Sequence, residues 1–261
     1  ARMQGYWPQT YIDTVITGTM NVLNYCVSVA ARRIVFAQSV ADGSYMYGNN
    51  RLIPADAPQK FPLNDDHSVY SICKNAAVNL IEHYCVKYGL KRFVLRLPNI
   101  YLYHPNPYYF FNGEERWQSY RLLIERAKLG LPIELWGNPD LQRDVVYVKD
   151  CAQIIVKSLS AEVDGGIYNV GTGVGTSMRE QIEGMVEVFS PANHSSEIIE
   201  RPDKPDTVSY IMDVSKTISE LSYKPQYDYL SYLRDMKNEM EVEPFGKLWG
   251  KGKDYFFGLL E

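Results

Sequence analysis

The feature that most constrains the fold is a regular alternation of short apolar strands with amphipathic helical segments. Apolar residues at helical spacing predict a helix over residues 10–31, and the run Arg33-Ile-Val-Phe-Ala37 predicts a buried strand. A second helix is expected over residues 68–88, followed by a strand over residues 92–97 that Pro98 stops. Strands that alternate with helices are typical of a parallel sheet, so the sequence predicts an α/β fold.

The alternation continues through the middle of the chain and weakens toward its end. The elements expected there are helices over residues 116–129, 149–160 and 177–189, and strands over residues 133–136, 144–148 and 167–170. Ser177 and Glu180 have the spacing of a capping box, which marks the start of the last of these helices. The stretch over residues 38–67 is expected to be mostly loop, with Asp65 to His67 as a solvated segment and helix cap. Residues 242–261 are expected to form a tail.

The bulk composition excludes several classes of function. With 27 Lys and Arg against 31 Asp and Glu, the chain has a formal net charge of −4, which gives no reason to expect nucleic acid or an anionic membrane as partner. No apolar run reaches the ~18 residues of a membrane span, and the first residues have no signal-peptide core. The four cysteines and four histidines are not clustered as zinc ligands are. We therefore expect a cytoplasmic protein with free thiols and no metal site.

One element of a dinucleotide-binding fold is absent from the sequence. Such a fold opens with a strand, a glycine-rich loop and a helix, whereas this chain opens with a helix that no G-x-G-x-x-G motif precedes. The segment Gly171-Thr-Gly-Val-Gly175 lies between a strand and a helix, but it lacks that register and the Lys-Ser/Thr pair of a P-loop, so we interpret it as a tight turn. Because the chain also begins with Ala1 rather than Met, we expect a fragment or a naturally shortened protein.

A Tyr-x-x-x-Lys pair, Tyr70-Ser-Ile-Cys-Lys74, lies at the start of the second expected helix. Residues four apart share one face of a helix, so the Lys74 ammonium can lie near the Tyr70 phenol. A nearby cation favours the phenolate and lowers a tyrosine pKa from about 10, as a tyrosine acid or base near neutral pH requires. With 21 tyrosines in the chain, such a pair also arises by chance, and alone it indicates only a surface contact. Its surroundings decide between the two interpretations.

Those surroundings resemble the extended short-chain dehydrogenase/reductases, the NAD-dependent epimerase/dehydratase family that acts on nucleotide sugars. The resemblance covers nearly all of the chain, and its segments occur in the order that the family has. They are Thr17-Gly-Thr-Met-Asn-Val-Leu23, Arg33-Ile-Val-Phe-Ala-Gln-Ser39 with Tyr47-Gly48, Val69-Tyr-Ser-Ile-Cys-Lys74, Leu95-Arg-Leu-Pro-Asn-Ile-Tyr101, Gly137 with Arg143-Asp-Val-Val-Tyr-Val-Lys-Asp150, and Tyr168-Asn-Val-Gly-Thr-Gly173 with Ser177.

The resemblance implies a catalytic role for several residues. Tyr70 is expected to be the acid/base that exchanges a proton with a sugar hydroxyl, and Ser39 to hydrogen-bond the reacting oxygen. Lys74 is expected to hold the nicotinamide ribose and to lower the pKa of Tyr70. Tyr70, Lys74 and Pro98 are the implied cofactor contacts. Because the loop after Ser39 is longer than the family usually has, Ser44 is an alternative to Ser39.

The resemblance also implies a substrate site for the diphosphate of a nucleotide sugar. Asn99, Arg143 and Arg201 are the expected contacts, and arginine suits this role because it is a permanent cation with a forked set of donors. The alternative for Arg143 is an ion pair with Asp140 or Asp144 at the surface.

The expected architecture is a partial Rossmann-like, doubly wound parallel sheet with a smaller C-terminal α/β substrate-binding region. Residues 1–100 are expected to form the C-terminal part of a dinucleotide-binding domain. Residues 101–261 are expected to form the substrate-binding region, of which about 143–171 packs back on the first part. The aromatic run over residues 101–111 is expected to contribute core and pocket wall.

The expected function is that of an NAD(P)-dependent nucleotide-sugar epimerase or dehydratase, with NAD or NADP as cofactor. A nucleotide-sugar reductase is an alternative within the same family. The missing glycine loop motivates another alternative, a truncated, non-catalytic relative that acts in binding or assembly. Members of the family pair through two helices per subunit, which implies a homodimer formed through residues 10–31 and 68–88.

Overall fold

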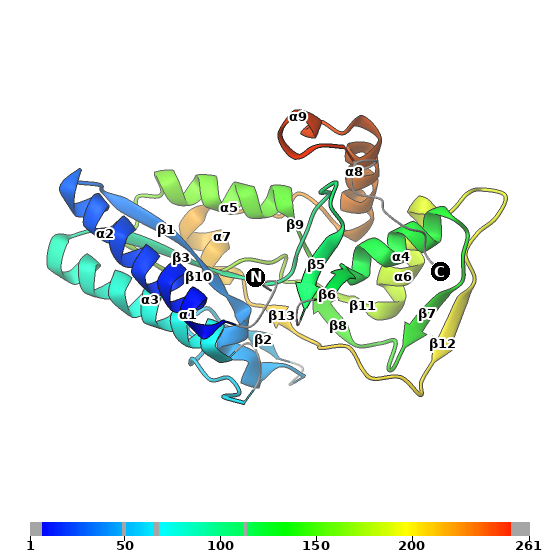
Figure 1. Ribbon diagram of the computed structural model, residues 1–261, viewed down its shortest axis with the longest axis horizontal. Coiled ribbons are helices and arrows are strands. Elements are labelled where there is room, and N and C mark those ends of the chain that lie inside the picture. Colours follow the sequence, from blue (N-terminus) through cyan, green and yellow to red (C-terminus); the bar gives the residue numbers. More distant parts are fainter. Residues whose placement is uncertain (1–6, 49–50, 65–67, 112–113, 252–261) are drawn as a thin grey trace.

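The computed structural model describes residues 7–48, 51–64, 68–111 and 114–251 (Figure 1). Within these ranges the helices are α1 (Pro8–Tyr11), the π-helix η1 (Ile12–Thr17), α2 (Gly18–Ser28), the 3-10 helix η2 (Val40–Met46), α3 (Ser68–Tyr88), α4 (Ser119–Lys128), α5 (Val148–Ser160), α6 (Met178–Phe189), α7 (Ser215–Leu221), α8 (Tyr229–Val242) and α9 (Gly246–Trp249). The strands are β1 (Arg33–Ser39), β2 (Leu52–Ile53), β3 (Lys91–Leu97), β4 (Ile100–Tyr101), β5 (Tyr108–Phe111), β6 (Glu114–Trp117), β7 (Ile133–Trp136), β8 (Gln142–Asp144), β9 (Val146–Tyr147), β10 (Gly165–Asn169), β11 (Gly175–Ser177), β12 (Ile198–Arg201) and β13 (Ile211–Met212).

The main sheet consists of three parallel strands in the order β1-β3-β10. Helices α2 and α3 lie over one face of it, and α5 and α7 lie over the other (Figure 1). On the α5 side, Phe93 and Leu95 of the central strand pack with Ile154 and Leu221. Strands connected through helices and paired in parallel confirm the predicted Rossmann-like α/β fold.

The segment predicted as one helix over residues 10–31 is divided into α1, η1 and α2. It ends at Ser28, because Ala30 takes a left-handed φ of 52° and the N–H of Ala31 donates to the carbonyl of Cys26 at 2.8 Å. This six-to-one hydrogen bond is a standard helix terminator. The π-helix between α1 and α2 has no signature in the hydrophobic periodicity, so the sequence did not predict it.

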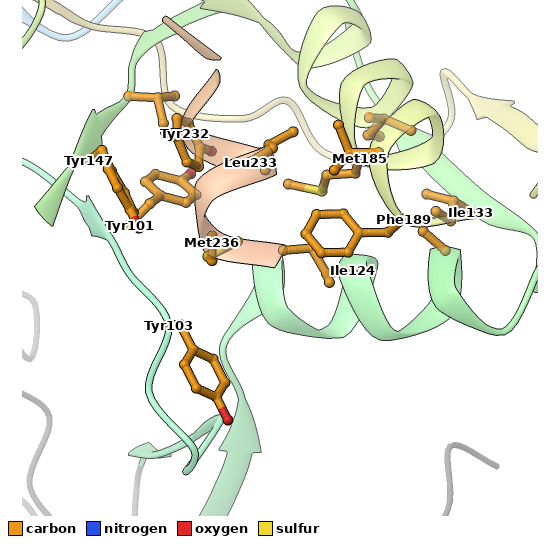
Figure 2. Packing of buried hydrophobic residues seen from close by; sticks show 14 of the residues in the cluster. Tyr101, Tyr103, Ile124, Ile133, Tyr147, Met185, Phe189, Tyr232, Leu233 and Met236 are labelled. Atoms are coloured by element: carbon orange, nitrogen blue, oxygen red, sulfur yellow. The ribbon is translucent and has the colours of Figure 1, made fainter. Parts of the chain in front are cut away.

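The second region, on the right of Figure 1, is organised around helices α4, α6 and α8. Its core contains side chains from all three helices, among them Ile124, Met185 and Leu233 (Figure 2). Tyr101 and Tyr103 from the aromatic run belong to the same core (Figure 2). The parallel pair β7-β12 lies along the outside of this region. No helix in the described part of the chain is both long and apolar enough to cross a bilayer.

The strand predicted over residues 144–148 is wrong in its bounds. Strand β8 ends at Asp144 and pairs with β11, whereas β9 pairs with β4, so the chain changes partner at Val145. Helix α5 then begins directly at Val148. The apolar pattern of the sequence cannot reveal a change of partner strand, because β8 and β9 have the same strand periodicity on either side of Val145.

The longer loops contain more structure than the composition indicated. The stretch over residues 38–67 includes η2 and β2, while Asp65 to His67 lie outside the described residues. Toward the end of the chain, Asp228 is the N-cap of α8, and its carboxylate accepts the N–H of Ser231 at 2.7 Å. The predicted tail over residues 242–261 contains α9, and residues 252–261 lie outside the described part.

Candidate active site

A pocket of about 580 Å³ lies at the carboxyl ends of β1 and β3. Such a volume is typical of small-molecule sites, and the carboxyl ends of parallel strands are where α/β folds bind ligands. The structure brings six of the predicted site residues together in its lining: Ser39, Tyr70, Lys74, Pro98, Asn99 and Arg143. The other lining residues are Ala37, Gln38, Leu97, Ile100, Tyr101, Tyr109, Gln118, Ser119 and Tyr120.

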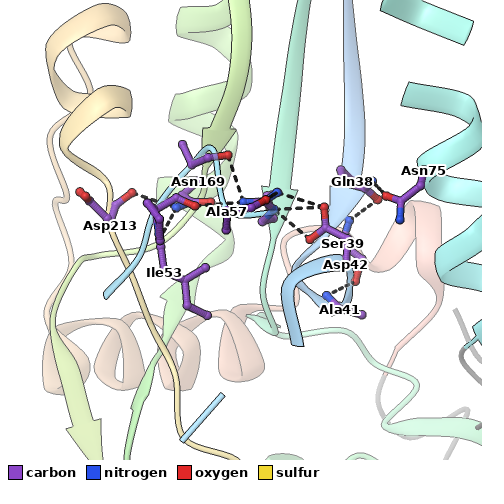
Figure 3. A network of polar contacts seen from close by, with 12 residues as sticks. Gln38, Ser39, Ala41, Asp42, Ile53, Ala57, Asn75, Asn169 and Asp213 are labelled. Atoms are coloured by element: carbon purple, nitrogen blue, oxygen red, sulfur yellow. Dashed lines mark hydrogen bonds and ion pairs between the residues drawn. The ribbon is translucent and has the colours of Figure 1, made fainter. Parts of the chain in front are cut away.

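Ser39 is the last residue of β1, and hydrogen bonds on either side of it fix its position. The buried Gln38 amide donates to the Asn75 side chain at 2.8 Å, and its oxygen accepts the N–H of Ser39 at 2.8 Å (Figure 3). The Ser39 hydroxyl accepts the N–H of Ala41 at 3.2 Å, which starts helix η2. Ser44 lies farther along η2 and is not part of the pocket lining, so the geometry favours Ser39 over Ser44.

Behind Ser39, a buried ion pair anchors the segment that follows β1. The guanidinium of Arg96 lies 2.9 Å from the Asp42 carboxylate, and the two residues are 0% and 2% exposed. Arg96 also donates to the carbonyls of Pro54, Ala55 and Ala57. Burial raises the pKa of Asp42, and the Arg96 cation acts in the opposite direction. These bonds tie η2 and the loop near β2 to the central strand.

Tyr70 lies in the first turn of α3 and points into the pocket next to Ser39. Burial raises the pKa of the Tyr70 phenol, and a hydrogen bond with the Ser39 hydroxyl lowers it by a smaller amount. The predicted reduction of the Tyr70 pKa by Lys74 does not appear. The net direction is upward, so near neutral pH the phenol keeps its proton.

Lys74 is one helical turn from Tyr70, and its ammonium is engaged with β1. Its Nζ donates to the carbonyl of Ala37 at 2.7 Å and lies 4.8 Å from the centre of the Phe36 ring. The distance from Nζ to the centre of the Tyr70 ring is 5.6 Å. Burial lowers the pKa of Lys74. The ammonium is therefore bound to the backbone of β1, and the causes of the Tyr70 pKa shift are burial, Ser39 and Tyr11 rather than Lys74.

Arg143 of β8 reaches the pocket from the second region. Its Nε donates to the carbonyl of Val208 at 3.2 Å, its Nη2 donates to the hydroxyl of Thr207, and it hydrogen-bonds Tyr101. The alternative of a pair with a neighbouring aspartate is wrong for Asp144, whose fully buried carboxylate points away and accepts hydrogen bonds from Thr172, Gly173 and Met212. Successive residues of a strand face opposite sides, which separates the charges of Arg143 and Asp144.

Arg201, predicted as a third substrate contact, lies outside the pocket lining. Its guanidinium bonds the carboxylates of Glu134 at 2.6 Å and Asp203 at 2.9 Å. Those two acids come from β7 and from the turn after β12, and they neutralise the cation at the outer edge of the second region. Sequence alone missed this because Glu134 is far from Arg201 along the chain.

Several pocket residues were not predicted as site residues. Gln118 and Ser119 are the N-cap and the first residue of α4, and Tyr109 comes from β5. Tyr109 falls within the aromatic run that was expected to contribute pocket wall. For Gln118 and Ser119 the available signal was the helix start itself, because residues at a helix N-terminus often face a ligand.

Comparison with known proteins decides the family. The model of the NAD dependent epimerase/dehydratase family matches residues 5–171. The chain belongs to this family. Among curated members, it is 26% identical to the UDP-glucose 4-epimerase of Dictyostelium discoideum over 92% of this chain and 71% of that protein. It is 25% identical to the dTDP-glucose 4,6-dehydratase of Haemophilus influenzae over 86% of this chain and 68% of that protein.

Solved structures of epimerases share the fold. The UDP-glucose 4-epimerase of Thermotoga maritima aligns with a TM-score of 0.68 and 22% identity, over 88% of this chain and 72% of that one. The UDP-N-acetylglucosamine 4-epimerase of Methanobrevibacter ruminantium aligns with a TM-score of 0.70 and 20% identity, over 90% and 71%. The present chain covers only part of the length of its relatives. Its match spans 62% of an uncharacterized protein of Methanocaldococcus jannaschii and 60% of UDP-glucose 4-epimerase 2 of rice.

The three predicted cofactor contacts lie together in the described structure. Tyr70, Lys74 and Pro98 all belong to the pocket lining. A pyrophosphate needs a run of unpaired backbone N–H groups. In the turn over residues 171–175, the N–H groups of Thr172 and Gly173 are already bound by Asp144, as expected for a tight turn rather than a phosphate loop. In the described ranges, no three His, Cys, Asp or Glu side chains are grouped to hold a metal ion.

Proposed function

We propose that the protein containing this chain is an NAD(P)-dependent nucleotide-sugar epimerase or dehydratase. The observation that carries the proposal is the meeting of Ser39, Tyr70 and Lys74 with Asn99 and Arg143 in one pocket. These residues come from separate parts of the chain, and a structural role alone gives no reason for them to converge. The curated relatives include both a UDP-glucose 4-epimerase and a dTDP-glucose 4,6-dehydratase, which supports this class of substrate.

The proposed chemistry centres on the Tyr70 phenol. Bound NAD or NADP supplies the hydride acceptor and donor for a sugar carbon. Tyr70, with its raised pKa, is protonated near neutral pH and is suited to donate its proton to a sugar carbonyl oxygen. Ser39, which is hydrogen-bonded to Tyr70 in the protein without substrate, would turn its single O–H to the same sugar oxygen when the substrate binds. In the reverse step Tyr70 takes the proton of the sugar hydroxyl.

The proposed anchor of the substrate is its diphosphate. Arg143 is held in place by Thr207 and Val208, so its planar guanidinium is oriented before the ligand binds. Asn99 lies in the same pocket, between β3 and β4, and its N–H donates to the Tyr210 hydroxyl at 3.4 Å. An arginine fork and an amide side chain suit phosphate oxygens.

The test uses the protein that contains this chain, produced from its whole coding sequence. We expect it to retain NAD or NADP through purification and to convert UDP-glucose or dTDP-glucose, with conversion lost in Tyr70→Phe. Product analysis by NMR distinguishes the 4-epimer, the 4-keto-6-deoxy sugar and a reduced sugar, and the last would favour the reductase. Binding of nucleotide sugars without cofactor retention or turnover would overturn the proposal in favour of a non-catalytic relative.

We also propose that two parts of the chain bind different ligands and that the protein is a homodimer. Residues 1–100 would serve the dinucleotide, residues 101–261 the nucleotide sugar, and about 143–171 would join the two. Exposed apolar residues on α2 and α3, among them Tyr25 and Val86, support pairing through these helices. A dimer in analytical ultracentrifugation that dissociates in Tyr25→Glu is the expected result, and a wild-type monomer would overturn it.

A further inference from the structure

A tyrosine on the first helix packs directly against the candidate catalytic tyrosine. The rings of Tyr11 on α1 and Tyr70 on α3 meet edge to face, with their centres 5.9 Å apart and their planes at 68°. Tyr11 is only 6% exposed, so its ring occupies the space between α1 and α3. Edge-to-face pairs of this kind prefer a defined mutual orientation, which an aliphatic contact does not.

The π-helix η1 determines which way Tyr11 points. Downstream of it, α2 is fixed on α3 through Leu23, which packs with Ile81, and through Asn24, which accepts the Tyr84 hydroxyl at 2.6 Å. A π turn holds one residue more than an α turn, so it rotates the segment before it by about 100° relative to a continuous helix. A continuous α-helix fixed at α2 would place Tyr11 about 100° around the helix axis from its observed position beside Tyr70. Insertions of this kind occur frequently at functional sites.

We propose that Tyr11 is a positioning residue, whose ring holds the Tyr70 phenol against Ser39 and keeps water away from it on the α1 side. The catalytic meaning of this contact rests on the proposed function, but the contact itself does not. Among the described residues, groups from three different elements contact the Tyr70 side chain: Tyr11 from α1, Ser39 from β1 and Lys74 from α3. Ser39 and Lys74 belong to the pocket lining and Tyr11 does not, so Tyr11 limits the movement of the Tyr70 ring from outside the pocket.

The electrostatics agree with this geometry. Burial is the largest cause of the raised Tyr70 pKa, and the neighbouring Tyr11 raises it further, while Ser39 lowers it. A phenol that swung away from Ser39 would gain water, which lowers its pKa, and would lose the Ser39 hydrogen bond, which raises it. Because burial is the larger cause, the net change is expected to be a fall in the Tyr70 pKa. Tyr11 therefore acts on the proton of Tyr70 without contacting the substrate.

The experiment measures the Tyr70 phenol in the protein without substrate or added cofactor, so its outcome is independent of the proposed function. Tyrosine labelled with ¹³C at Cζ gives one NMR signal per tyrosine, and Tyr70→Phe assigns the signal of interest. In Tyr11→Leu we expect the Tyr70 pKa to fall toward the ordinary tyrosine value, because water reaches the phenol. In Tyr11→Phe, which keeps the ring, we expect a smaller fall.

The matched control is Tyr84→Leu, which removes a tyrosine of similar burial, 8% exposed, from the same interface of α2 and α3. If Tyr11 acts only through general packing, both leucine variants will leave the Tyr70 pKa unchanged or move it equally, and either result would overturn the proposal. Should Tyr11→Leu fail to fold, an NMR measurement on the wild-type protein tests the contact instead. Cross-relaxation between the Tyr11 and Tyr70 rings supports the contact, and its absence refutes it.

A second readout applies to the active enzyme. Tyr11→Leu is expected to lower kcat by about two- to tenfold, the range that the loss of one edge-to-face contact corresponds to. KM for the nucleotide sugar is expected to stay unchanged, because Tyr11 is not part of the pocket lining to which Asn99 and Arg143 belong. A rise in KM at constant kcat would contradict a role in positioning Tyr70.

Discussion

Replacing Arg96 by Met tests whether the buried ion pair with Asp42 maintains the segment that follows Ser39. Arg96 is fully buried and bonds one carboxylate and three backbone carbonyls. Removing one partner of a buried pair leaves an uncompensated charge, which costs about 3–5 kcal/mol. Methionine fills much of the volume, so a cavity adds little to this figure. We therefore expect Arg96→Met to lose about 3–5 kcal/mol of unfolding free energy at pH 7.

The loss should depend on pH in a defined direction. Burial already raises the pKa of Asp42 above its ordinary value of 3.8, and Arg96 opposes that rise. A carboxyl whose pKa is higher in the folded state binds more protons in that state. Its contribution to the unfolding free energy therefore declines as the pH rises from its pKa in the unfolded state to its pKa in the folded state. Without Arg96 this window extends to higher pH. The difference between Arg96→Met and wild type is therefore expected to be smaller at pH 4.5 than at pH 7.

Urea unfolding followed by circular dichroism at the two pH values measures both expectations. Arg234→Met is the matched control, because Arg234 pairs with Glu187 at the surface, where both side chains are more than half exposed. Its loss is expected to stay below about 0.5 kcal/mol. If Arg96→Met loses less than about 1 kcal/mol at pH 7, or if its loss is the same at both pH values, the assignment of a compensated buried charge is refuted.

Three further substitutions test the site and its frame. Ser39→Ala is expected to lower kcat on the order of a hundredfold by removing one donor to the reacting oxygen, while Ser44→Ala leaves steady-state turnover unchanged; equal losses would contradict the choice of Ser39. Arg143→Ala is expected to raise KM for the nucleotide sugar about tenfold or more, whereas Arg201→Ala does not, and isothermal titration with UDP distinguishes the two. Ser177→Ala is expected to lower the unfolding free energy by about 1 kcal/mol through loss of the helix cap, and a thermal midpoint identical to wild type would show that the cap is dispensable.

The parts of the fold that local chemistry determines could be predicted from the sequence. Helix α3 occupies the predicted residues 68–88, because an uninterrupted helical pattern there is followed by a glycine with φ of 70°. The capping box of Ser177 and Glu180 forms as its spacing indicated. Both are properties of residues a few positions apart, which a sequence displays directly.

The parts that depend on distant partners could not be predicted. The environment of Arg201 is set by Glu134, which arrives through the pairing of β7 with β12. The direction of the Tyr70 pKa depends on how deeply the phenol is buried and on where β1 holds the Lys74 ammonium. Neither quantity can be read from the i and i+4 spacing, which places two side chains on one face without fixing their surroundings.

The Arg-Asp dipeptide at the end of β8 makes this segment intolerant of insertions and deletions. Arg143 faces the pocket, while Asp144 binds the N–H groups of the turn after β10 from the interior. A shift of one residue in a strand exchanges its two faces. Such a shift would bury a guanidinium among backbone N–H groups that need an anion and turn a carboxylate toward the site proposed for a diphosphate. Length changes near β8 are therefore expected to abolish folding and ligand binding together, whereas changes of side chain can separate them.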